Sequence, residues 1–161
     1  MTKNILLTTD FSLESLQILK GLLNEYQFNN QINYNIHLVI GYDRGDSIRD
    51  LLFDNHTKII SKLKTNEFDE ACAILRNKFS NQINDIQCHI FSGYFQNSFD
   101  QFVESKKIDQ IYFSKRKPTH IDKNVFDIMR FIKKCKIEKI EVSHENQSIS
   151  HERGKLAAFF T

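Results

Sequence analysis

The residues that could bind a ligand follow the apolar runs of the sequence directly, at the ends of the predicted β-strands. After the first run, at residues 4–9, come a carboxylate and a hydroxyl that can make hydrogen bonds. After the fourth run, at residues 110–113, comes a basic segment that can hold an anion by charge. Because the carboxyl ends of parallel strands meet at one end of a sheet, we expect these residues to form one site. The candidate binding residues are Asp10, Ser12, Tyr42, Gly93, Ser114, Lys115, Arg116, Lys123 and Asn124.

No catalytic or metal-binding motif accompanies these residues. The six histidines show no ligand spacing such as H-E-x-x-H, and Cys72, Cys88 and Cys135 form no C-x-x-C pair. The sequence also lacks a G-x-S-x-G nucleophile turn, a dinucleotide-binding G-x-G-x-x-G and a G-x-x-x-x-G-K-[ST] loop. We therefore assign no catalytic residue and no metal. The sequence favours a non-enzymatic role and leaves open a nucleotide hydrolase that would use Asp10.

The charge is unevenly distributed along the chain. Residues 105–139 hold eleven Lys and Arg against four Asp and Glu, a net of +7, whereas residues 1–104 hold nine against thirteen, a net of −4. A basic segment of this kind suits a phosphate, an acidic partner or single-stranded nucleic acid, and a solvated basic face on the fourth helix is the more common explanation of such a charge cluster. The whole chain carries only +2, so we expect neither bulk nucleic-acid binding nor a membrane partner.

The length and composition fit one α/β domain. The chain has 161 residues, five glycines and one proline, which leaves little material for linkers between domains. We expect a domain at residues 1–143 and a tail at residues 144–161, whose apolar end either docks on the molecule or is disordered. Three cysteines at scattered positions suggest a reducing compartment, so we expect a cytoplasmic protein.

Strand and helix patterns alternate along the chain, which predicts a parallel sheet covered by helices on both faces. Ser12 is a good N-cap for the first helix, and Asn124 could cap the fourth. The expected strands are residues 4–9, 35–42, 86–91, 110–113 and 139–142. Between them we expect helices from Ser12 to about residue 30, one long helix through residues 68–79, and helices at residues 95–103 and 125–132. The predicted fold class is thus α/β, a three-layer doubly wound fold with a five-stranded parallel sheet.

The composition of the strands indicates their order in the sheet. The first, second and fourth strands are continuously apolar, as buried central strands are, whereas the third and fifth alternate with polar residues. This pattern favours the order 3-2-1-4-5. The flavodoxin-like order 2-1-3-4-5 would bury Gln87 and His89 at the centre of the sheet.

The opening segment Asn-Ile-Leu-Leu-Thr-Thr-Asp-Phe-Ser, followed by a leucine-rich helix, resembles the universal stress protein family. Gly93 also stands where that family commonly has a glycine. The resemblance covers roughly residues 3–143, and its one specific motif is the first strand and turn. It implies an adenine-nucleotide-binding fold in which Asp10 contacts the nucleoside and the chain near Tyr42 lines the adenine pocket.

The sequence departs from this family at the phosphate loop. The nucleotide-binding members have a Gly-x2-Gly-x9-Gly-Ser/Thr pattern after the fourth strand, and residues 114–125 of this chain contain no glycine. Glycines let successive backbone amides approach a phosphate, so tight ATP binding in the family's manner is not expected. Lys115, Arg116, Lys117 and Lys123 could hold an anion by charge instead. No cofactor is assigned, and ATP or AMP are the candidates.

Two functional hypotheses follow. The first is a stress-response binding module with a degenerate adenine-nucleotide or anion site at the carboxyl ends of strands one and four. The second is a dimeric interaction protein that keeps the fold and has lost the nucleotide. An exposed edge strand must be protected or used, so we expect a homodimer in which the fifth strand pairs with its two-fold mate and Lys139 of one chain lies opposite Glu141 of the other. The resemblance also implies dimerisation by this strand.

Overall fold

The computed structural model describes residues 2–25, 31–45, 55–114 and 122–142. The expectations for Lys115, Arg116, Lys117 and the tail at residues 144–161 lie outside the described residues. Within them, no helix is long and apolar enough to cross a bilayer.

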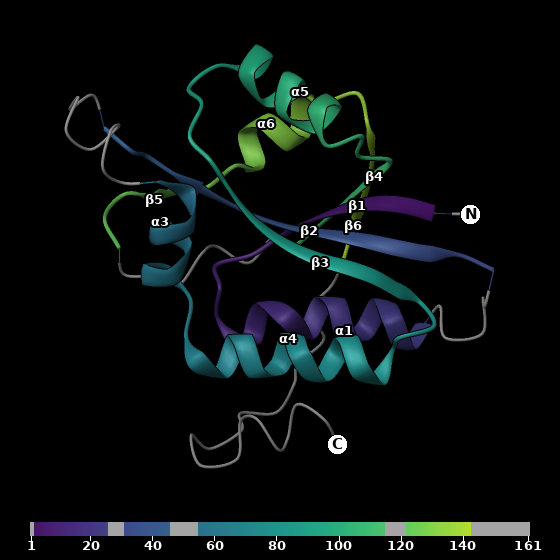
Figure 1. The fold of residues 1–161 in the computed structure, drawn as a ribbon. Helices are drawn as coiled ribbons and strands as arrows, with labels where there is room; N and C mark the ends of the chain where they lie inside the picture. The colour runs from purple at the N-terminus through teal and green to yellow at the C-terminus, as the bar shows by residue number, and fades with distance from the viewer. Residues whose placement is uncertain (1, 26–30, 46–54, 115–121, 143–161) are drawn as a thin grey trace.

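The described chain forms a six-stranded sheet between two layers of helices (Figure 1). Five parallel strands run in the order β3-β2-β1-β4-β6, and β5 pairs antiparallel with β2. The strands are β1 (Thr2–Thr8), β2 (Asn33–Tyr42), β3 (Ile83–Phe91), β4 (Gln110–Phe113), β5 (Val125–Phe126) and β6 (Glu138–Glu141). The predicted order is confirmed, since the fifth expected strand is β6 and lies at the edge opposite β3.

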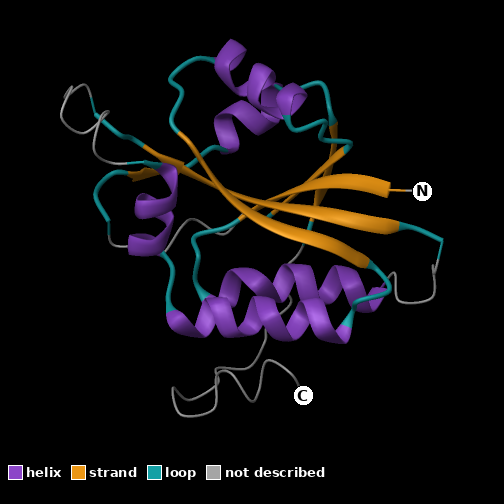
Figure 2. Cartoon of the chain, in the orientation of Figure 1, coloured by secondary structure: helices purple, strands orange, loops and turns teal. Residues whose placement is uncertain are grey.

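The helices divide between the two faces of the sheet (Figure 2). The pair α1 and α4 covers one face, and α5 and α6 cover the other (Figure 1). Their bounds are η1 (Leu13–Ser15), α1 (Leu16–Glu25), α3 (His56–Leu63), α4 (Asn66–Lys78), α5 (Gln96–Ser105) and α6 (Met129–Lys134). The predicted three-layer arrangement is therefore confirmed.

Each face of the sheet has its own apolar core. In β1, Leu7 belongs to the core under α1 and α4, and its neighbour Leu6 belongs to the core under α5 and α6. Both leucines are fully buried, as a central parallel strand requires. Burying such a side chain contributes about 1.5–3 kcal/mol to the stability of the fold. The buried central strands therefore hold the residues that follow their carboxyl ends in place.

The first helix begins as expected. The Ser12 side chain caps the short helix η1 by accepting a hydrogen bond from the Ser15 amide, and α1 continues directly from it. This cap satisfies one of the amides that a helix N-terminus leaves without a partner.

The helix expected through residues 68–79 is present as α4, and a separate helix, α3, precedes it, because Thr65 starts α4 by accepting a hydrogen bond from the Phe68 amide at 3.1 Å. One helix expectation is wrong. The helix expected at residues 125–132 begins only at Met129, and its N-cap is Ile128. Asn124 therefore does not cap it.

The short strand β5 replaces the first turn of that expected helix. Gly41 of β2 pairs with Phe126, and Tyr42 pairs with Val125. This approach needs a glycine, because a Cβ atom at residue 41 would lie 2.5 Å from the Phe126 carbonyl oxygen. The pairing is long-range, so the local apolar pattern of residues 125–132 could not reveal it.

Candidate functional site

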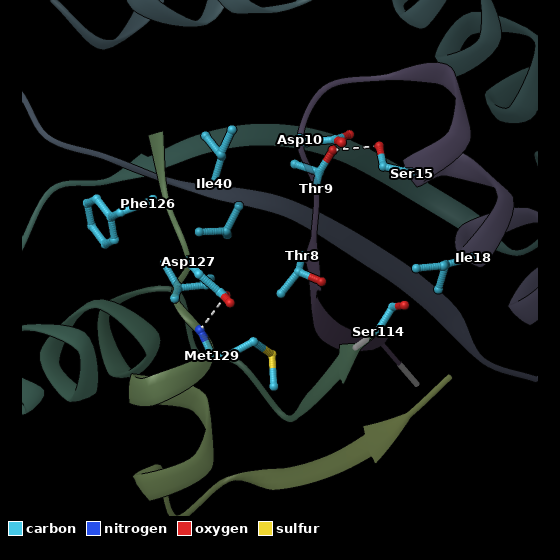
Figure 3. Close-up of a pocket in the computed structure, with 13 residues that line it drawn as sticks. Thr8, Thr9, Asp10, Ser15, Ile18, Ile40, Ser114, Phe126, Asp127 and Met129 are labelled. Atoms are coloured by element: carbon cyan, nitrogen blue, oxygen red, sulfur yellow. Dashed lines mark hydrogen bonds between the residues drawn. The ribbon is translucent and has the colours of Figure 1, made fainter. Parts of the chain in front are cut away.

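A small cavity lies at the carboxyl ends of β1 and β2, beside the end of β4 (Figure 3). Its volume is about 50 Å³. Asp10 and Ser114 line it, together with Thr9, Ser15 and Asp127. It thus lies between β1 and β4, where the chain reverses its direction of winding and α/β sheets commonly bind ligands.

The turn after β1 holds Asp10 in place through its own side chains. The Asp10 Oδ1 atom accepts hydrogen bonds from the Ser12 amide, at 3.0 Å, and from the Ser12 hydroxyl. The Thr9 and Ser15 hydroxyls lie 2.8 Å apart, and the Phe11 amide donates to Thr9 Oγ1 at 2.9 Å. Phe11 has a φ of 59°, so the chain turns sharply at that residue.

Asp10 is nearly buried, with 6% of its surface exposed. A buried carboxylate is stable only when hydrogen bonds satisfy it, and the Ser12 amide and hydroxyl supply two. The carboxylate and the surrounding hydroxyls suit the hydroxyl groups of a sugar better than the oxygens of a phosphate.

Asp127 brings a second carboxylate to the same cavity. Its Oδ1 atom accepts a hydrogen bond from the Met129 amide at 2.9 Å, which orients the side chain at the start of α6 (Figure 3). Among the described residues that line the cavity, none is a lysine or an arginine. The described wall is therefore acidic, and two carboxylates repel a polyphosphate.

β5 narrows the site on the side of β2. Phe126, Ile128 and Met129 all line the cavity, and both Phe126 and Ile128 contact the position above Gly41. Beside them, the Asn124 side-chain amide donates a hydrogen bond to the Tyr42 hydroxyl at 3.3 Å. Tyr42 is 6% exposed, belongs to the core and pairs with Val125 of β5, and it is not among the residues that line the cavity.

The structure brings only part of the predicted set together. Asp10 and Ser114 share the cavity, and Ser12 is bonded to Asp10. Tyr42 and Asn124 contact each other outside the lining, and Lys123 is exposed and does not line the cavity. Gly93 lies apart, in a different hollow after β3.

Sequence reasoning missed Ser15, Phe126 and Asp127 as site residues. Ser15 could have been found, because it follows Asp10 by five residues in the same turn and helix start. Asp127 and Phe126 reach the site only through the pairing of β5 with β2. Among the described residues, no group of three or more His, Cys, Asp or Glu side chains could hold a metal ion.

Solved structures resemble this chain over almost its whole length. The universal stress protein UspA from Lactobacillus plantarum has a TM-score of 0.54 and is 12% identical, over 88% of this chain and 97% of that one. The chain has the fold of the universal stress proteins. The universal stress protein from Archaeoglobus fulgidus is similar as well, with a TM-score of 0.51 and 14% identity over 88% of this chain and 93% of that one.

Sequence comparison adds no further relative. No family model matches the chain, and no curated protein matches it. The structures show the fold, and the sequence identities are only 12% and 14%. A shared fold does not imply a shared function, so the chemistry of the site depends on the residues of this chain.

Proposed function

We propose that this chain is a universal-stress-protein-like binding module with an altered adenine-nucleotide site at the carboxyl ends of β1 and β4. The observation that supports this most directly is the buried Asp10 carboxylate at the wall of the cavity there. The sequence resemblance to the universal stress protein family implies that this aspartate contacts the nucleoside. The turn that holds it is already formed by Ser12, Thr9 and Ser15.

The altered part of the site is the part that would hold phosphates. Residues 114–125 contain no glycine, and the described wall of the cavity carries Asp127 and no basic side chain. The β- and γ-phosphates of ATP would find no basic side chain on this described part of the wall, so we expect the nucleoside to supply most of the affinity. We expect AMP to bind at least as tightly as ATP.

The size of the cavity makes this binding weak. Pockets for small ligands usually measure roughly 300–1,000 Å³, and the cavity here measures about 50 Å³. A nucleoside could enter only if β5 and the residues after it moved away from Gly41, and the free energy of that movement is subtracted from the affinity.

Isothermal titration calorimetry with AMP and ATP tests the proposal. The wild-type protein should bind both with affinities within about threefold of each other, and Asp10→Asn should weaken AMP binding by about tenfold, or about 1.4 kcal/mol. Asp100→Asn is the matched control, because Asp100 is exposed on α5 and does not line the cavity. ATP binding much tighter than AMP binding would contradict the altered phosphate site.

A second candidate function is a dimeric interaction protein that binds no nucleotide. The specific observation in its favour is the closure of the site, since Phe126 and Ile128 occupy the space above Gly41. If neither AMP nor ATP gives a heat of binding, this candidate replaces the first.

Both candidates include a homodimer through β6. This strand lies at the edge of the sheet, and the Val142 amide after it donates inward to Phe113 of β4 at 2.8 Å. Because backbone groups alternate along a strand, the amide of Glu141 points outward, toward a two-fold mate. Lys139 would then lie opposite Glu141 of the second copy, a favourable pair of charges.

Light scattering after size exclusion tests the dimer. Glu141→Pro removes the outward amide and should halve the mass, whereas Glu141→Gln keeps the amide and should remain dimeric. A monomeric wild-type protein, or a dimer that survives Glu141→Pro, would remove β6 as the interface. A cytoplasmic location and a role in stress responses belong to the same proposal and rest on the thiols and the resemblance.

A further inference from the structure

A second hollow is lined by residues of the edge strand β3, of α5 and of the start of α3. Its volume is about 330 Å³. The described wall of the Asp10 cavity carries two carboxylates, whereas the described wall of this hollow carries a lysine and two histidines and no carboxylate. The side chains that matter here are His56, His89, Ser92, Ser98, Phe102 and Lys106. The two sites share no lining residue.

His89, which lines this hollow, is paired with the buried His37. The Nδ1 atom of His37 lies 3.0 Å from Nε2 of His89, and the two rings are stacked with centroids 5.2 Å apart. Phe102 packs its edge against the His89 ring. His37 is 6% exposed, so the pair is anchored in the sheet and fixes His89 at the wall of the hollow.

Lys106 supplies the positive charge in the described wall of the hollow. Burial is the main cause that lowers the pKa of His37, His56 and His89, and the charge of Lys106 lowers each pKa further. For His56 the charge of Arg44 has a larger effect than that of Lys106, and Asp85 acts in the opposite direction on His37. Among the described residues, Lys106 makes no ion pair within 4.0 Å.

A polar atom in the wall lacks a partner. The Ser92 hydroxyl is buried and makes no hydrogen bond among the described residues. Ser98, in the first turn of α5, lines the same hollow, and no side chain caps the amides at the start of that helix. A buried hydroxyl without a hydrogen bond is costly, and a bound acceptor would remove that cost.

We propose that this hollow binds a phosphate group, as inorganic phosphate or as the phosphate of a small monoester. Lys106 supplies the charge, and the Ser92 hydroxyl, together with the imidazoles of His56 and His89, supplies hydrogen bonds. Phe102 forms an apolar wall for the organic part of a monoester. At about 330 Å³ the hollow is large enough for such a molecule and reaches the lower limit for ligand pockets of roughly 300 Å³.

Titration calorimetry with inorganic phosphate and with glycerol 3-phosphate at pH 7 tests this site. The wild-type protein should bind both, and tighter binding of the monoester would identify a small organic phosphate as the ligand. Lys106→Gln should weaken phosphate binding by about tenfold or more. Lys107→Gln is the matched control, since Lys107 is the next residue and does not line the hollow.

A second measurement locates the bound phosphate. In nuclear magnetic resonance spectra, phosphate should shift the ring signals of His89 and His56, and Ser92→Ala should reduce the affinity without changing the fold. The absence of binding at about 20 mM phosphate, or an equal loss in Lys106→Gln and Lys107→Gln, would overturn the proposal. Asp10→Asn should leave phosphate binding unchanged, so the result is independent of the nucleotide site.

Discussion

The carbonyl oxygen of Phe126 lies only 2.5 Å from the point that a Cβ atom would occupy at Gly41. These residues are 85 positions apart in the sequence, and their contact attaches β5 to the end of β2. The same contact narrows the cavity beside Asp10, so the closure of the site depends on a glycine in the sheet.

Gly41→Ala should therefore destabilise the protein. The new methyl group would overlap the backbone and ring of Phe126, and overpacking of this kind costs about 1–3 kcal/mol. Urea unfolding measures the loss. Gly21→Ala in α1 is the control, because the methyl group that alanine adds there would have no neighbouring atom within 4 Å, and the change should stabilise by about 0.5–1 kcal/mol. Equal stability of the two variants would contradict the tight contact.

Thr65 should be important as a helix cap. Its hydroxyl accepts a hydrogen bond from the Phe68 amide at 3.1 Å, at the start of α4. Thr65→Ala should lower the free energy of unfolding by about 1 kcal/mol, and Thr65→Ser, which keeps the hydroxyl, should retain most of it. If both variants unfold at the same urea concentration, the hydrogen bond of the cap does not contribute to the free energy of unfolding.

The histidine pair should make stability depend on pH. Burial, followed by the charge of Lys106, lowers the pKa of His89 to about 4, from 6.5. The folded state therefore binds fewer protons than the unfolded state between these two values, and stability must fall as the pH drops from about 6.5 to 4. After a reduction for partial exposure to solvent, the loss is about 1–2 kcal/mol.

Thermal unfolding at a series of pH values checks this expectation. His89→Gln removes the titrating group, so its melting temperature should fall less than that of the wild-type protein over the same range. His56 and His37 also have a lowered pKa, so part of the dependence should remain in the variant. A variant with the full wild-type dependence would show that His89 is not responsible.

Cys72 should react slowly in the folded protein. Burial, with a smaller effect of the neighbouring Cys88, raises the pKa of its thiol to about 12. Because the thiolate is the reactive form, alkylation by iodoacetamide at pH 8 should be at least about a hundredfold slower than in urea. Mass spectrometry of the digested protein gives the rate at this residue. Equal rates in buffer and in urea would contradict the burial.

The sheet could be predicted from the sequence because burial in a parallel sheet leaves a local pattern. Gln87 and His89 alternate with apolar residues, which placed β3 at an edge, and the unbroken apolar run around Leu6 placed β1 at the centre. The Ser12 cap was predictable for the same reason, since the cap and the helix it starts are adjacent in sequence.

The site was predictable only in part. Asp10 follows its strand directly, so its place at the carboxyl end of β1 was confirmed. Phe126 and Asp127 follow a helical pattern in the sequence, and only the distant Gly41 draws them into a strand and to the site. The pairing of β5 with β2 depends on Gly41 and Phe126 together, so neither segment of the sequence predicts it alone.

The hydrogen bonds among Thr9, Asp10, Ser12 and Ser15 are complete within a single stretch of seven residues. A molecule arriving at this turn meets a scaffold that is already rigid, so association there requires no ordering of the backbone around the carboxylate. Selectivity at Asp10 would then come from the steric fit of a ligand to a fixed shape. Any adjustment to ligands of different shape would come from the β5 side of the cavity.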